Sequence, residues 1–145
     1  MRNINHMAVW AAAITHFAIG AVWYSVLQQP WLAGIGKTMA ELTRDNGGSP
    51  LPYVIGFATI LVMAYVMAWI LQRLDARTIG AGAQVGAALG LGLVAMQLGL
   101  NYAFEWRALS LWLVNGGYAV LGLAVMGGII GGWHRSRSQA ADTRA

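Results

Sequence analysis

The chain contains no cysteine and few charged residues. The missing cysteine excludes disulfide bonds, iron–sulfur clusters and thiolate metal sites. Only 10% of the 145 residues are charged, whereas a soluble domain carries about 25%. This composition indicates that the protein is built for surroundings other than water.

Recognisable catalytic motifs are also missing. The sequence has no HExxH zinc motif, no phosphate-binding glycine loop, no paired carboxylates in an apolar stretch and no serine–histidine–acid set. His6 and His16 lie ten residues apart, which separates them by about 15 Å along a helix, so they cannot share a metal. We therefore expect no metal and no cofactor, and these absences argue against an enzyme.

Four long apolar stretches make up most of the chain. They cover about residues 7–27, 53–71, 79–104 and 109–133, and none contains Asp, Glu, Lys or Arg. A helix of about 20 apolar residues crosses the hydrocarbon core of a bilayer. The sequence thus predicts an all-α integral membrane four-helix bundle in one domain, 1–145. The first stretch is too long for a signal peptide, and residues 134–145 are expected to form a flexible basic tail.

The basic residues are divided unevenly between the two sides that four spans define. Basic residues that flank spans stay cytoplasmic, so we expect cytoplasmic N- and C-termini in a prokaryotic cytoplasmic (inner) membrane. Topology explains the positive charge, and we expect the lipid bilayer rather than nucleic acid as the partner. The side of the termini carries Arg2, Arg73, Arg77, Arg135, Arg137 and Arg144, and the other side carries Lys37, Arg44 and Arg107.

The first external loop, 28–52, is the only long connection. Pro30 is expected to bar the first helix from continuing. Thr38 and Glu41 have the spacing of a capping box, which predicts a short surface helix near 39–45 that ends at Asn46-Gly47-Gly48. The loop is either a passive connection or a lid, since loops longer than about 12–15 residues are often functional.

Glycines at four-residue spacing indicate where helices approach closely. Lipid tails are as apolar as leucine, so close backbone contact and hydrogen bonds between helices must hold the spans together. The glycines pack helices inside one chain or form a homodimer seam. The expected packing glycines are Gly20, Gly82, Gly86, Gly90, Gly128 and Gly132.

His16 lies near the middle of the first apolar stretch. An ionisable side chain at that depth is costly and normally faces the interior of the bundle. One interpretation is a neutral imidazole that is hydrogen-bonded to another helix. The alternative is a proton relay or a ligand contact.

A second polar group is expected in the outer half of the membrane. Gln97, Asn101 and Glu105 recur every four residues and share one helix face. Either these groups line a shallow, externally open pocket, or they are hydrogen-bond staples between spans. The remaining members of the group are Tyr24, Ser25, Arg107 and Asn115.

Most tryptophans and tyrosines lie near the ends of the apolar stretches. Rings with one polar atom suit the headgroup layer, so an interfacial belt is the expected role. This set comprises Trp10, Trp23, Tyr24, Trp31, Tyr53, Trp69, Tyr102, Trp106, Trp112 and Trp133.

Several short motifs together resemble a family of small bacterial four-span membrane proteins that is catalogued only as a domain of unknown function. They are Gly20-Ala21-Val22-Trp23-Tyr24-Ser25, Trp31, Gly36 with Thr38 and Glu41, Phe104-Glu105-x-Arg107, Leu113-x-Asn115-Gly116-Gly117-Tyr118, Met126-Gly127 and Gly131-x-Trp133. Val26 departs from the pattern, because family members often have Pro there.

The resemblance implies a compact four-span protein and no particular activity. It also implies that Trp23, Tyr24, Ser25, Glu105, Arg107, Asn115 and Tyr118 belong together.

Three functions remain open from the sequence. The first is a non-enzymatic structural or accessory membrane subunit, with a homo-oligomer or another membrane protein as its partner. The second is a small carrier or channel for protons or a small polar solute, which would use His16 and the outer polar group. The third is an enzyme that acts on a lipid or a quinone through Glu105 and Arg107.

Overall fold

The computed structural model describes the backbone of residues 4–142 and the side chains of residues 4–133. Over this range the chain forms helices and turns and contains no strand. Four helical segments are long and apolar enough to cross a membrane, so the prediction of an all-helical four-span protein is confirmed. The segments are α1 (His6–Val26), α4 (Leu51–Arg73), the continuous unit α5–η1–α6 (Ile79–Phe104) and the first part of α7 (Leu109–Asp142).

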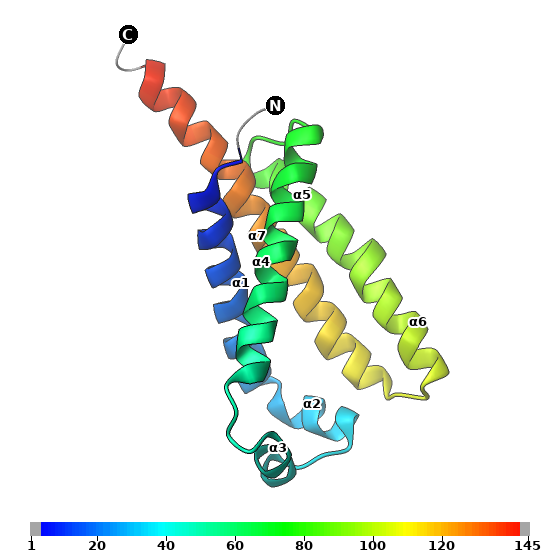
Figure 1. Cartoon of the computed structure of the whole chain (residues 1–145). Coiled ribbons are helices and arrows are strands. Elements are labelled where there is room, and N and C mark those ends of the chain that lie inside the picture. The colour runs from blue at the N-terminus through cyan, green and yellow to red at the C-terminus, as the bar shows by residue number, and fades with distance from the viewer. Residues whose placement is uncertain (1–3, 143–145) are drawn as a thin grey trace.

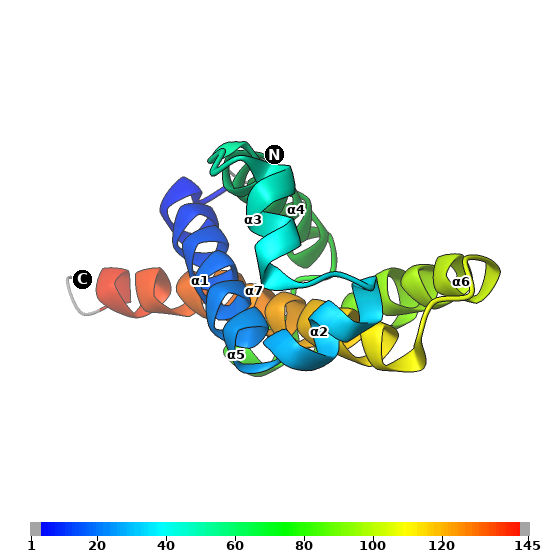
Figure 2. The same cartoon turned by 90° about the horizontal axis from the view of Figure 1, so that it is seen from below.

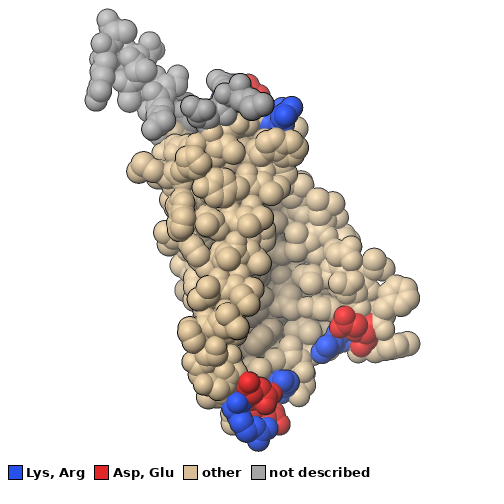
Figure 3. All heavy atoms as spheres, in the orientation of Figure 1, with Lys and Arg blue, Asp and Glu red and all other residues tan. Residues whose placement is uncertain are grey.

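The four spans run alternately up and down (Figure 1). One end of the molecule, the terminal end, holds the start of α1, the turn between α4 and α5, and the end of α7. The opposite end, the loop end, holds α2, α3 and the turn between α6 and α7. Charged side chains lie at these two ends of the face in Figure 3, and the surface between them is uncharged. The 21 residues of α1 have a length of about 31 Å, which is enough to cross the hydrocarbon core of a bilayer. A bilayer would therefore cover this uncharged belt.

Helix α7 is longer than its apolar stretch. Its backbone stays helical beyond Trp133 as far as Asp142, so most of the segment expected as a tail is helical. The side chains of 134–142 and the residues 143–145 lie outside the described part of the chain. The flexibility of this segment stays a prediction.

The first helix ends at Val26, before Pro30, but it is followed by helix α2 (Gln28–Ile35), which was not predicted. The chain breaks at Leu27, the residue between α1 and α2. Pro30 then falls in the first turn of a new helix, where a missing backbone N–H costs no hydrogen bond. Helix α2 packs on α7 and buries Leu32.

Helix α3 (Met39–Asn46) confirms the predicted surface helix. The Thr38 backbone N–H donates to the Glu41 carboxylate over 2.7 Å, and the Glu41 N–H donates to the Thr38 hydroxyl over 3.3 Å. The first of these bonds is the main reason that the pKa of Glu41 is lowered. Gly47 ends the helix in the left-handed conformation, at φ 57°.

Helices α5 (Ile79–Leu89) and α7 pack with their backbones in direct contact. A Cβ atom placed at Gly82 would overlap the carbonyl oxygen of Gly127, and one at Gly86 would overlap that of Leu123. The two backbones therefore touch along this line, as small-residue helix pairs do in membranes. On α7 the backbone contact falls on Gly127 rather than on its neighbour Gly128.

The third span contains a π-helical segment, η1 (Gly90–Ala95), between α5 and α6 (Met96–Phe104). The Met96 N–H donates to the Leu91 carbonyl five residues back, where an α-helix would use the fourth. After Gly90, the next residues that face α7 are Ala95 and Gly99. Because a π turn holds more residues than an α turn, Gly90 and Ala95 can both face α7 although they lie five residues apart. The small residues of the span thus stay in contact with α7.

Candidate functional site

His16 is buried between α1 and α7, with 2% of its surface exposed. Its ring lies directly over Gly122, where a side chain would collide with it. The Tyr118 ring meets it edge-on at 5.0 Å between centroids, and the Tyr118 hydroxyl donates to the His16 backbone carbonyl over 3.3 Å. Within the described residues, the His16 Nδ1 atom has no hydrogen-bond partner. The site is thus a closely fitted imidazole with one unused polar atom.

Asn115 of α7 joins three spans through its side-chain amide. Its Oδ1 accepts a hydrogen bond from the Tyr24 hydroxyl of α1 over 2.9 Å. Its Nδ2 donates to the Tyr102 hydroxyl of α6 over 2.8 Å. Tyr24 also contacts the rings of Tyr118 and Trp31, at 5.3 and 5.6 Å between centroids. We call Tyr24, Asn115 and Tyr102 the amide staple.

Trp23 makes a similar connection one position before Tyr24. Its indole N–H donates to the Val114 carbonyl over 2.9 Å, and the ring covers Gly117 of α7. Tyr118 in turn covers Gly20 of α1. Along the α1–α7 interface, glycines on one helix make room for rings on the other.

Trp112 of α7 makes the corresponding contact with the third span. Its indole N–H donates to the Ala95 carbonyl at the end of η1 over 2.7 Å, and its ring lies against Gly99. Sequence reasoning assigned Tyr102 and Trp112 to the interfacial belt and did not single out Gly117 or Gly122. The available signal was the glycines that lie against other rings, which are Gly99 against Trp112, Gly117 against Trp23 and Gly122 against His16.

We expect Trp112→Phe to lower the free energy of unfolding by about 1 kcal/mol, because it removes one hydrogen bond between helices and leaves a gap beside Gly99. Unfolding in mixed micelles, followed by far-UV circular dichroism, measures the loss. Trp106→Phe is the matched control, since Trp106 is 94% exposed and the substitution should change little. Equal effects of the two substitutions would contradict the role of the indole bond.

The other predicted polar residues do not join this group. Gln97 Nε2 donates to Asn101 Oδ1 over 3.1 Å, and both side chains are exposed. Ser25 donates to a backbone carbonyl of its own helix, one turn earlier. Glu105 and Arg107 form an exposed ion pair at 3.0 Å in the turn between α6 and α7. The predicted outer cluster is therefore divided into the amide staple, an exposed amide pair and a surface ion pair.

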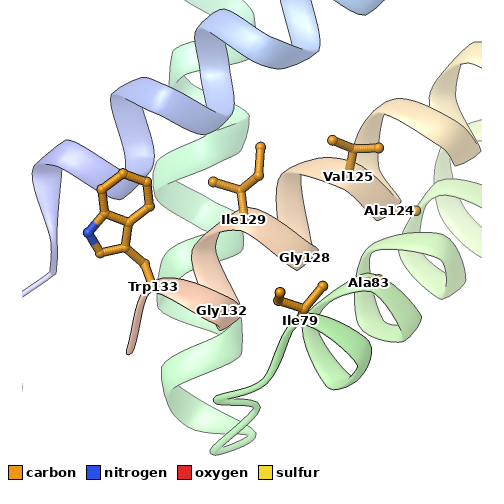
Figure 4. A pocket seen from close by; sticks show the side chains of 8 residues that line it. All are labelled: Ile79, Ala83, Ala124, Val125, Gly128, Ile129, Gly132 and Trp133. Carbon is orange, nitrogen blue, oxygen red and sulfur yellow. The ribbon is translucent and has the colours of Figure 1, made fainter. Parts of the chain in front are cut away.

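An apolar groove lies between α5 and α7 at the terminal end (Figure 4). Ile79 and Ala83 form one wall, and Gly128 and Ile129 belong to the other. A side chain at Gly132 would meet Ile79. Gly128 and Gly132 thus border this groove, beside the backbone contact that Gly127 makes.

The chemistry of these groups is that of hydrogen bonding within the fold. The amide staple is neutral, and its members are hydrogen-bonded to one another. In the described part of the chain, no three His, Asp or Glu residues are grouped to hold a metal ion.

Comparison with known proteins gives a family and no activity. No curated protein and no solved structure matches the chain. A family model matches residues 7–131. This range covers the second and third spans completely, the first span except for its opening residue and the last span except for its final two residues. It also includes the amide staple. The resemblance noted from the sequence motifs is confirmed, and the chain belongs to the family described as Protein of unknown function (DUF1761).

Proposed function

We propose that the protein is a non-enzymatic, structural or accessory subunit of a prokaryotic cytoplasmic membrane, with both termini in the cytoplasm. The four apolar spans and the excess of basic residues on the side of the termini support this placement. Its function is then to contact other membrane proteins rather than to convert or carry a solute.

The observation that carries the proposal is the use of the polar side chains inside the bundle. The side chains of the amide staple, Trp23 and Trp112 all form hydrogen bonds between helices. A transport path needs polar groups that are free to exchange partners with a solute. Groups that are already paired across helices fasten the spans instead.

A carrier or channel is the second candidate, and the unpartnered His16 Nδ1 atom favours it. An imidazole inside a membrane protein can relay protons if water reaches it. The lipid- or quinone-directed enzyme has weaker support, because Glu105 and Arg107 neutralise each other in an exposed ion pair.

Cysteine labelling distinguishes these candidates, since the chain has no cysteine of its own. His16→Cys is treated with a membrane-impermeant thiol reagent from each side of sealed vesicles. We expect no labelling at position 16 from either side. Arg44→Cys in α3 is the accessible control, and Ile14→Cys on the exposed face of α1 is the lipid-facing control. Labelling at position 16 but not at position 14 would overturn the proposal in favour of a hydrated path.

A further inference from the structure

We propose that the outer face of α6 is the contact through which two copies of this chain form a dimer. This inference rests on the proposed function and names the partner of the subunit. The face consists of Gln97, Leu100, Asn101 and Phe104, which we call the α6 seam. All four side chains are exposed, and Leu100 and Phe104 are 54% and 82% exposed.

The α6 seam follows one side of a helix, because its residues stand at positions i, i+3, i+4 and i+7. The opposite side of α6 is already occupied. Gly99 lies against Trp112, and Tyr102 is bonded to Asn115, so both face α7. Figures 1 and 2 place α6 at the edge of the molecule, away from α1 and α4. The seam therefore faces outward from the chain.

Two amides on that face are costly if lipid covers them. Gln97 lies seven residues before the end of the span, or about 10 Å along the helix axis. Hydrocarbon offers no hydrogen bonds. The bond between Gln97 and Asn101 uses one donor and one acceptor, whereas two amides together offer four N–H donors and two carbonyl oxygens.

A second copy of the chain is the occupant that these groups fit. Amides both donate and accept, so identical amides can pair with each other without any charge mismatch. Two copies in one membrane have the same orientation, and a two-fold axis along the membrane normal sets their α6 helices parallel. The Gln97 and Asn101 amides of one copy then lie at the same depth as those of the other, within reach of one another. Leu100 and Phe104 supply the apolar contact on either side.

The groove between α5 and α7 is a competing surface. Ala124, Gly128 and Gly132 recur every four residues along it. Small residues alone leave no polar group in need of a partner, and lipid chains can fill such a groove. The amides on α6 thus favour the α6 seam.

Disulfide cross-linking in native membranes tests the inference. Leu100→Cys, the only cysteine in its chain, should give a disulfide-linked dimer on mild oxidation, because it meets its counterpart at the seam. Val62→Cys on α4 is the matched control, with 64% exposure, and should stay monomeric. Val125→Cys reports on the competing groove. A dimer that forms at Val125 and not at Leu100, or equally at Val62, overturns the inference.

A second variant tests the amides themselves. Gln97→Leu with Asn101→Leu should weaken the dimer about tenfold, as judged by the mass of the protein against its dilution in detergent. The helical content should stay unchanged, because within the described residues these side chains are hydrogen-bonded only to each other. Dimerisation at the original strength would contradict the amide pairing, and cross-linking only to a different protein would contradict self-association. Labelling of the His16→Cys variant would contradict the proposed function, but it would not change the result of the dimerisation experiments.

Discussion

Gly86→Ala is expected to lower the free energy of unfolding by about 1–3 kcal/mol, although it adds a single methyl group. The methyl carbon would overlap the carbonyl of Leu123 and press on the backbone of Ala124. Backbone atoms of a packed helix cannot turn aside as a flexible side chain can. The helices α5 and α7 must therefore separate, which also loosens the contact at Gly82. Titration with a denaturing detergent, followed by far-UV circular dichroism, measures the loss.

The same span supplies the controls. At Gly80 and Gly92, a Cβ atom would meet nothing within 4 Å apart from the helix's own neighbouring backbone. Alanine is a better helix former than glycine by about 1 kcal/mol, so Gly80→Ala and Gly92→Ala should be neutral or slightly stabilising. If all three substitutions change stability alike, close backbone contact is not what holds α5 to α7.

Asn115→Leu should lower the free energy of unfolding by about 1–2 kcal/mol, because it removes both hydrogen bonds of the amide staple. Leucine keeps a side chain of similar size, so the loss reports mainly the bonds. The hydroxyls of Tyr24 and Tyr102 also lose their common partner inside the protein.

Double-mutant cycles assign this loss to the two bonds. Tyr24→Phe and Tyr102→Phe are each measured alone and together with Asn115→Leu. Each cycle should give a coupling of about 0.6 kcal/mol, the typical strength of such a bond within a membrane. Tyr53→Phe is the control, because Tyr53 is 67% exposed. Additive effects, with no coupling, would show that the staple does not bind α1 and α6 to α7.

The sequence predicted the features that depend on neighbours along the chain. The four spans follow from uninterrupted apolar length. Helix α3 follows from the capping box of Thr38 and Glu41, a pattern that is complete within four residues. The bond between Gln97 and Asn101 likewise reflects their four-residue spacing on one helix.

Features that depend on contacts between helices could not be predicted in the same way. Trp112 and Trp106 both occur near the ends of spans, yet one donates to Ala95 and the other is exposed. The pairs of adjacent glycines left two possible faces on α7, and only packing against α5 selects Gly127 over Gly128. Helix α2 was missed because its Pro30 indicates a break, and the break falls at Leu27 instead.

The π-helical segment of the third span has a consequence for length variation. Deleting one residue from an α-helix turns everything beyond it by about 100°, which would move Gly99 and Tyr102 off α7. Between Gly90 and Ala95, however, a deletion can convert the wide turn into an ordinary one. The residues beyond it then rotate far less, and the span shortens by about 1.5 Å. This segment is therefore the place where the third span can lose a residue while keeping the same partners.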